Sequence, residues 1–154
     1  MTVIYAVIAL AIIVFDQLAK LWTVNSGSFG GKFGEIPYIA DLVYVKNTGA
    51  AFSMFSGKVE ILGVISVMFC IGVIVYWILK KPKHPLLCTA VSAMFSGALG
   101  NAIDRITRGF VVDYIDVKFM DFPVFNIADI AICVGGVLLV LYVMFFDKGK
   151  TENE

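Results

Sequence analysis

The sequence predicts an α-helical membrane protein with four transmembrane helices. The 154-residue chain is 60% hydrophobic and 16% charged, whereas soluble domains are nearer half apolar and about a quarter charged. Its mean hydropathy is +0.90, and the apolar residues fall into long uncharged runs. The net charge is zero, so nothing suggests the basic surface of a nucleic-acid-binding protein.

Three apolar runs are long enough to cross a bilayer, which takes about 20 mostly apolar residues. Residues 61–79, 86–103 and 130–146 contain no charged side chain. A fourth run, residues 3–15, is shorter and is followed by Asp16 and Lys20. These two residues are four apart, so on a helix they share a face and can pair, which makes residues 2–23 an adequate span.

The predicted organisation is therefore one integral-membrane domain, residues 1–154. Its spans are expected at about residues 2–23, 59–79, 86–105 and 126–146, and its outer segments at residues 24–58 and 106–125.

Lysine positions predict the orientation. Lys80, Lys81 and Lys83 crowd the link between the second and third spans, and Lys148 and Lys150 follow the fourth. Cytoplasmic loops are enriched in such residues. Both termini are therefore expected in the cytoplasm, and the two longer connecting segments outside.

The outer segments contain strand-like stretches. "LVYVK" (42–46) and "FVVDYIDVKF" (110–119) are rich in β-branched and aromatic residues, and the second alternates apolar and polar positions. A small extracytoplasmic β-sheet, or cradle, at the membrane surface is expected from them.

Polar residues gather at the outer ends of the spans and in the outer strand. Ionisable groups near hydrocarbon are costly and usually face a cavity or one another. The topology therefore predicts one shared site at the outer interface. Its candidate members are Asp16, Lys20, Asn101, Asp104, Arg105, Asp113, Asp116, Asn126 and Asp129.

The strand period distinguishes two of the acids. Asp113 shares a strand face with the apolar Val111 and Ile115, while Asp116 points the other way. A carboxylate on an apolar face resists ionisation. If Asp129 is its neighbour, the two share a proton, because like charges a few ångström apart cannot both ionise easily. This is the arrangement that an aspartic protease needs.

Each candidate also has a purely structural interpretation. Asn126 and Asp129 suit a helix N-cap and its first turn. Arg105 and Arg108 suit the C-terminal end of a helix that Gly109 would stop. Asp16 and Lys20 form a structural pair, and Asn47-Thr48-Gly49 a turn.

Five motifs in order resemble those of the lipoprotein signal peptidases (type II signal peptidases), a family of bacterial inner-membrane aspartic endopeptidases. The motifs are "DQLAK" (16–20), "NTGAAFS" (47–53), "GALGNAIDR" (97–105), "VVDYID" (111–116) and "FPVFNIAD" (122–129). Small departures from the family pattern at Ala19, Ser96 and Tyr114 leave open only packing and substrate fit.

The resemblance implies a catalytic dyad of Asp113 and Asp129. The supporting positions that it implies are Asp16, Lys20, Asn47, Gly49, Asn101, Asp104, Arg105 and Asn126. The implied substrate is a diacylglyceryl-modified prolipoprotein, cut just before the lipidated cysteine at the outer face of the bacterial cytoplasmic membrane. Membrane lipid is an expected partner and a monomer the expected state, with no metal, organic cofactor or nucleic acid.

Aromatic residues flank the expected site. Most of them suit the belt of aromatic side chains found at membrane interfaces, and some are also expected to line a groove that receives the acyl chains of the substrate. They are Trp22, Phe29, Phe33, Phe52, Phe55, Tyr114, Phe119, Phe122 and Phe125.

Two other classes of protein fit parts of the pattern. A small four-span transporter or channel subunit also gathers charges, but typically along a path through the bilayer, and the inner halves of the last three spans carry none. A non-catalytic structural membrane protein has no need of Asp113 and Asp129 together.

Overall fold

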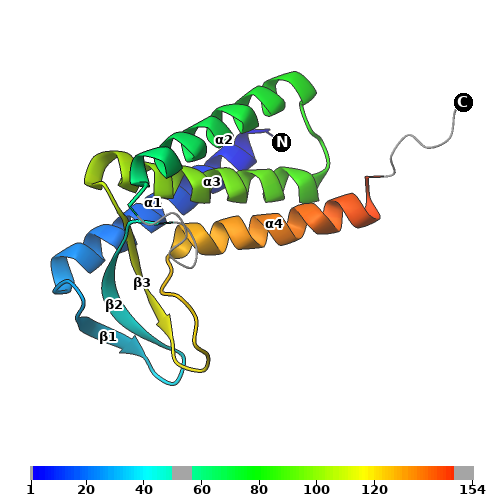
Figure 1. Cartoon of the computed structure of the whole chain (residues 1–154). Coiled ribbons are helices and arrows are strands. Elements are labelled where there is room, and N and C mark those ends of the chain that lie inside the picture. The colour runs from blue at the N-terminus through cyan, green and yellow to red at the C-terminus, as the bar shows by residue number, and fades with distance from the viewer. Residues whose placement is uncertain (1, 50–56, 148–154) are drawn as a thin grey trace, which may run out of the picture.

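The structure is a computed structural model that describes residues 2–49 and 57–147. In chain order these residues form α1 (Thr2–Ser26), β1 (Lys32–Ile36), β2 (Ala40–Asn47), α2 (Val59–Lys80), α3 (Pro85–Arg108), β3 (Val111–Val117) and α4 (Ile127–Phe145). The helices form an elongated bundle, and the strands form a small sheet at one end of it (Figure 1).

All four helices are long and apolar enough to cross a membrane, which confirms the four predicted spans. The first and third helices continue to Ser26 and Arg108, three residues beyond their predicted ends. Helix α3 ends at Arg108 and is capped by Gly109, which has a φ of 73° and adopts the left-handed conformation. Basic residues in this last turn, Arg105 and Arg108, complement the helix dipole.

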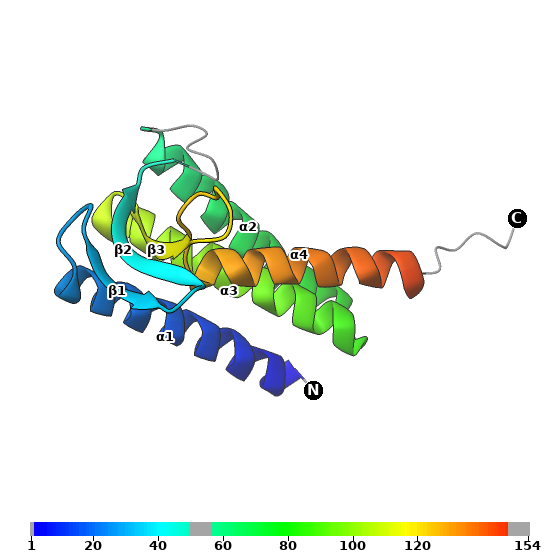
Figure 2. The ribbon, with the colours of Figure 1, turned by 90° about the horizontal axis from the view of Figure 1, so that it is seen from below.

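Helix α3 is the centre of the bundle. It packs against α1, α2 and α4, and most of its buried residues are small. A Cβ at Gly97 would collide with the backbone carbonyl of Ala128, and one at Gly135 would lie 2.7 Å from the carbonyl oxygen of Ala90. Small residues therefore let α3 and α4 approach closely, as is common between membrane helices. Figure 2 shows α3 between α1 and α4.

The sheet is antiparallel in the order β1-β2-β3. Strands β2 and β3 confirm the two predicted stretches, whereas β1 was not predicted. In the β2–β3 register, Asn47 lies opposite Val111 and Val45 opposite Asp113. The sheet thus brings the end of β2 next to the beginning of β3, where the predicted site residues lie.

Burial along β3 does not alternate from residue to residue, as it would in a strand with one face exposed to solvent. Residues Val111, Val112, Asp113 and Tyr114 are all buried. Val112 and Tyr114 form a cluster with Tyr44, and Ala19 and Ile127 pack against it. Both faces of this half of the strand are covered, because one faces the helices and the other faces the cavity described next.

Candidate active site

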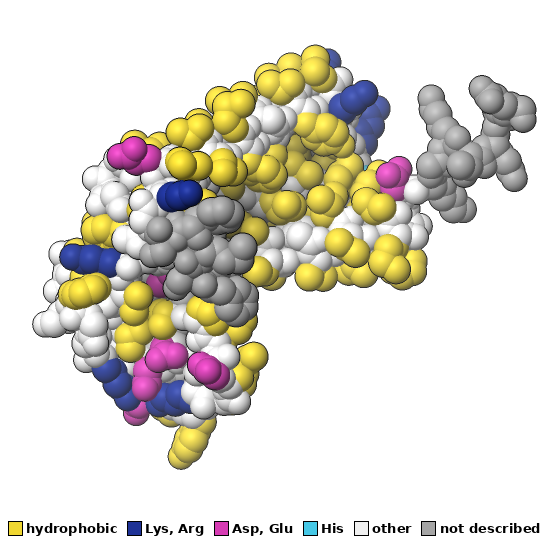
Figure 3. Space-filling model, viewed as in Figure 1, with side chains coloured by type: hydrophobic (Ala, Val, Ile, Leu, Met, Phe, Trp, Pro, Cys, Tyr) yellow, Lys and Arg dark blue, Asp and Glu magenta, His cyan; other side chains and the backbone are white. Residues whose placement is uncertain are grey.

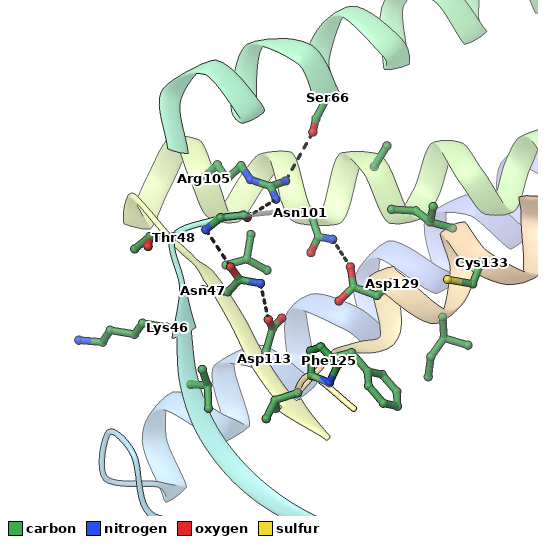
Figure 4. A pocket seen from close by; sticks show the side chains of 18 of the residues that line it. Lys46, Asn47, Thr48, Ser66, Asn101, Arg105, Asp113, Phe125, Asp129 and Cys133 are labelled. Carbon is green, nitrogen blue, oxygen red and sulfur yellow. Dashed lines mark hydrogen bonds between the residues drawn. The ribbon is translucent and has the colours of Figure 1, made fainter. Parts of the chain in front are cut away.

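Asp113 and Asp129 reach the same cavity from different elements. Asp113 is the third residue of β3 and is 2% exposed, and Asp129 lies in the first turn of α4. Both line an open cavity of about 1030 Å³ between the sheet and helices α2, α3 and α4 (Figure 4). The predicted proximity of the two carboxylates is therefore present in the fold.

Asn126 connects both aspartates and begins α4. Its side-chain oxygen accepts the backbone N–H of Asp129 at 2.9 Å, while Asp129 Oδ2 accepts the backbone N–H of Asn126 at 3.2 Å. This reciprocal pair is a capping box. Because the cap occupies the amide oxygen, the amide nitrogen must face the other way. It donates to Asp113 Oδ1 at 2.6 Å.

Asn47 is oriented in the same manner. Its side-chain oxygen accepts the backbone N–H of Gly49 at 2.8 Å, and its Nδ2 donates to Asp113 Oδ2 at 2.9 Å. The turn predicted for residues 47–49 is thus present, and it aims an N–H at the carboxylate.

Asn101 repeats the arrangement for the other aspartate. Its Oδ1 accepts from Lys20 Nζ at 2.9 Å, and its Nδ2 donates to Asp129 Oδ1 at 2.8 Å. Each of the three asparagines therefore has its oxygen occupied by a fixed donor and turns an N–H towards the dyad. Such donors hold the two carboxyl groups in place and stabilise negative charge on them.

The environment of Asp113 changes its ionisation. Burial, and after it the neighbouring charge of Asp129, raise the pKa of Asp113 from 3.8 to about 7, although hydrogen bonds from Asn47 and Asn126 oppose the rise. Asp113 consequently exchanges its proton close to neutral pH, which suits a carboxyl group that acts as a proton donor.

A buried lysine lies behind the dyad. Lys20 is 0% exposed and its Nζ lies 2.9 Å from Asp16 Oδ2 and 3.2 Å from Asp104 Oδ2. A buried charge is tolerated only when it is paired and hydrogen-bonded, and here two carboxylates and the Asn101 amide surround the ammonium group. The predicted Asp16–Lys20 pair is present within this larger network.

The acids of this network also bind the backbone next to the dyad. Asp16 Oδ1 accepts the N–H of Ala128 at 3.0 Å, and Asp104 Oδ2 accepts the N–H of Val112 at 3.0 Å. Ala128 precedes Asp129, and Val112 precedes Asp113. The network around Lys20 thus fixes both dyad segments against α1 and α3.

Arg105 lies on the cavity wall beside the dyad. It donates to the carbonyl of Gly49 at 3.2 Å and more weakly to Ser66 Oγ at 3.5 Å (Figure 4). Gly49 is therefore held between Asn47 and Arg105. The rest of its motif, residues 50–53, lies outside the described residues.

The structure joins all ten predicted site residues in one network, and it leaves Asp116 out. Asp116 is only partly buried and lies opposite Asp41 in the sheet. Sequence reasoning missed the ion pair of Arg108, whose Nε lies 3.3 Å from Asp104 Oδ1, although the spacing of four residues was available as a signal. It also missed the hydroxyl of Tyr114, which accepts the N–H of Ile127 at 3.3 Å.

Of the aromatic residues expected to line an acyl groove, only Phe122 and Phe125 line the cavity within the described part of the chain. Phe69 of α2, which was not expected, lines it as well. Trp22 packs on Phe33 and Phe29 on Tyr44 instead, and Phe52 and Phe55 lie outside the described residues. Nor do the described residues include a group of three His, Cys, Asp or Glu side chains that could hold a metal ion.

Comparison with known proteins agrees with this site. Residues 8–145 match the family model described as signal peptidase (SPase) II. The chain is 34% identical over 149 residues to lipoprotein signal peptidases of Staphylococcus aureus strains JH9 and Newman, which covers 96% of this chain and 91% of each relative.

Two solved structures share the fold, and both are described as bacterial membrane enzymes. One has a TM-score of 0.86 at 32% identity and covers 97% of this chain and 94% of its own. The other has a TM-score of 0.82 at 33% identity and covers 92% and 93%.

Proposed function

The chain belongs to the signal peptidase II family, and we propose that it is a membrane aspartic endopeptidase that removes the signal peptide from diacylglyceryl-modified prolipoproteins, just before the lipidated cysteine. The observation that carries the proposal is the convergence of Asp113 and Asp129 on one cavity, with asparagine N–H groups aimed at both. Removal of signal peptides is the activity that the family name describes.

The proposed mechanism uses one protonated and one ionised carboxyl group. Asp113, whose pKa burial raises to about 7, donates a hydrogen bond and then its proton to the scissile carbonyl oxygen. Ionised Asp129 takes a proton from a water molecule as the water oxygen attacks the carbonyl carbon. When the tetrahedral intermediate collapses, Asp129 gives its proton to the departing nitrogen of the lipidated cysteine, and Asp113 regains its own from the hydroxyl group.

The remaining site residues hold this geometry. Asn47, Asn101 and Asn126 position the carboxyl groups, and the network of Asp16, Lys20 and Asp104 fixes their backbones. Arg105 and Gly49 border the cavity, where they are suited to hold the extended backbone of the substrate.

The cavity wall supports binding of a lipidated substrate. Away from the dyad it is lined by apolar side chains of three helices, among them Ile65, Met94 and Ile132. A second hollow of about 510 Å³ shares Phe69 and Met94 with it, so the apolar surface continues along α2 and α4. Each buried CH₂ group contributes about 0.8 kcal/mol. Two acyl chains can therefore supply much of the binding energy.

We also propose the location and the orientation: the bacterial cytoplasmic membrane, with the dyad at its outer face and both termini in the cytoplasm. Lys80, Lys81 and Lys83 gather where α2 meets α3, at the end of the bundle opposite the sheet (Figure 3). Basic residues favour the cytoplasmic side. One chain supplies the whole dyad and its support, which favours a monomer as the working unit.

The four-span transporter is not favoured. Among the described residues, the buried charged side chains are Asp16, Lys20, Asp104 and Asp113. All four belong to the network at the sheet end, so they do not form a path across the membrane.

A matched pair of peptides tests the proposed function. The purified chain in lipid is given one prolipoprotein peptide with diacylglyceryl on its cysteine and the same peptide without it. We expect cleavage before the lipidated cysteine, and cleavage of the unlipidated peptide at least ~100-fold less well, which corresponds to about 2.7 kcal/mol. Equal rates would refute the lipid-binding cavity but keep a peptidase. No cleavage of either peptide would refute the proposed reaction.

A further inference from the structure

The end of the sheet farthest from the dyad carries an apolar surface that the proposed function does not use. Five side chains form this sheet tip: Ile36, Tyr38 and Ile39 around the β1–β2 turn, and Phe119 and Met120 after β3. All five are exposed, Tyr38 to 93% and Phe119 to 70%. The two segments adjoin, because the backbone N–H of Lys118 donates to the carbonyl of Ile39 at 3.0 Å. Several large apolar side chains left exposed at one end of a sheet favour an interaction site there.

The backbone at the turn presents Tyr38 outwards. Tyr38 has a φ of 64°, in the left-handed region that bulky side chains seldom adopt. The most exposed large hydrophobic side chain of the described residues therefore lies at a turn that holds it away from the sheet.

The position of the tip along the bundle identifies what it faces. Figures 1 and 2 share their left-to-right direction, which follows the helices. In both views the free end of the sheet lies level with the beginning of α4, while the outer ends of α1 and α3 extend farther. Since α4 enters the bilayer from that level in the proposed orientation, the tip lies level with the membrane boundary.

The charges behind the tip are mutually paired. Lys32 and Lys118 each contact both Glu35 and Asp41 at 2.8 to 2.9 Å. This group of two bases and two acids is neutral, and Asp116 and Asp121 add negative charge at the same end of the sheet. An attraction to anionic headgroups is therefore not what the tip offers. Its chemistry suits burial of apolar groups in the interfacial layer, where aromatic side chains are favoured.

We propose that the sheet tip inserts into the interfacial layer of the same bilayer that the helices span. The sheet is then held at two places, at its tip by lipid and at its other end by the helices. Strand β3, which carries Asp113, is thereby kept at a fixed depth beside α4.

Tryptophan fluorescence in vesicles tests this insertion without reference to activity. Both native tryptophans are first removed by Trp22→Phe and Trp77→Phe, and Tyr38→Trp is then added as the single fluorophore. The protein is reconstituted in phosphatidylcholine vesicles whose lipid is brominated near the top of the acyl chains. Two matched controls use the same background. Val137→Trp lies on the exposed surface of α4, and Thr107→Trp lies at the exposed outer end of α3.

We expect lipid brominated near the top of the acyl chains to quench most of the fluorescence of the indole at position 38. Lipid brominated deeper in the acyl chains should quench the indole at position 137. The indole at position 107 should keep most of its fluorescence in either lipid. Phe119→Trp is the second tip variant, in case the turn at residue 38 does not accept an indole. If the tip variants respond to aqueous acrylamide as strongly as position 107 and are insensitive to brominated lipid, the tip faces water and the proposal is wrong.

Discussion

Asn126 Nδ2 lies 2.6 Å from Asp113 Oδ1, and the oxygen of the same amide caps the helix that carries Asp129. The helix cap and the support of the dyad are thus two functions of one side chain. The structure confirms the predicted N-cap, whereas the role of Asn126 in supporting the dyad stays a prediction, and a suitable substitution separates the two.

Asn126→Ser keeps a good N-cap but is too short to donate to Asp113. Serine and asparagine are about equal as caps, so the cap is kept, and any fall in melting temperature comes from the lost amide contacts with Asp113, Asn101 and Val112. Asp113 becomes negatively charged as it gives its proton to the substrate, and loss of a hydrogen bond to a charged group costs about 1.5–3 kcal/mol, which predicts roughly a 10- to 100-fold fall in turnover. Asn126→Ala is the matched variant, and it should lose the same turnover and about 1 kcal/mol of stability besides. Normal turnover of the serine variant would show that the contact with Asp113 is dispensable.

The dyad assignment is tested by conservative replacement. Asp113→Asn and Asp129→Asn keep the shape of each side chain but remove its acid–base chemistry, so each is expected to abolish cleavage of a lipidated substrate while the protein still folds and inserts. Asp116→Asn is the control on the same strand, and it should remain active because Asp116 is outside the network. Near-normal turnover by either dyad variant would overturn the assignment.

The helices could be predicted from the sequence because a bilayer imposes a simple length requirement on uncharged runs. The two paired strands followed from their β-branched and aromatic residues. Strand β1 was missed because "KFGEI" contains a glycine, lacks clear alternation and depends on pairing with β2. Its formation is a tertiary effect that the local sequence does not encode.

The members of the site were predictable, but the way in which they act together was not. Their grouping followed from the depth at which each span ends. The orientation of Asn101, in contrast, depends on Lys20, 81 positions earlier in the chain. A local sequence pattern cannot predict whether the oxygen or the nitrogen of the Asn101 amide faces the Lys20 ammonium group. For the same reason, the contacts of Asp16 with Ala128 and of Asp104 with Val112 became visible only in the fold.

The close approach of α3 and α4 gives a prediction that involves no polar group. Gly97→Ala places a methyl group against the backbone carbonyl of Ala128 and 2.7 Å from Ile132 Cγ1. Overpacking of this kind costs typically about 1–3 kcal/mol, and here it also displaces the first turn of α4, where Asp129 lies. We expect a lower melting temperature together with reduced turnover. Gly136→Ala is the control, since its added Cβ meets no described atom of another element within 4 Å, and a similar loss in both variants would contradict the packing argument.

The proposed orientation predicts opposite labelling of two exposed positions. In a background without Cys70, Cys88 and Cys133, a single cysteine replaces Ser28 after α1 or Lys83 between α2 and α3. A membrane-impermeant thiol reagent should label Ser28→Cys in intact cells once any outer membrane is permeabilised. Lys83→Cys should be labelled only in inverted vesicles. Labelling at position 83 from outside would reverse the topology and move the dyad to the cytoplasmic face.

The ionisation of Asp113 predicts how activity depends on pH. Burial and the charge of Asp129 raise its pKa from the ordinary 3.8 to about 7, so the protonated form that the mechanism needs is lost as the pH rises through that value. We expect turnover to fall with a midpoint near 7, provided that chemistry limits the rate. Asn126→Ser should move this midpoint upwards, because the hydrogen bond from Asn126 lowers the pKa of Asp113.

The same shift has a consequence for stability. A carboxyl group whose pKa is higher in the folded state than in the unfolded state favours folding when the pH is low. This contribution to the free energy of unfolding is lost as the pH rises from the unfolded pKa to the folded pKa. The melting temperature in detergent should therefore decline between about pH 4 and pH 7, and Asp113→Asn should flatten this decline while Asp116→Asn keeps it. An unchanged slope in the Asp113→Asn protein would show that this carboxyl group is already ionised well below neutral pH, and its proposed role as the proton donor would be wrong.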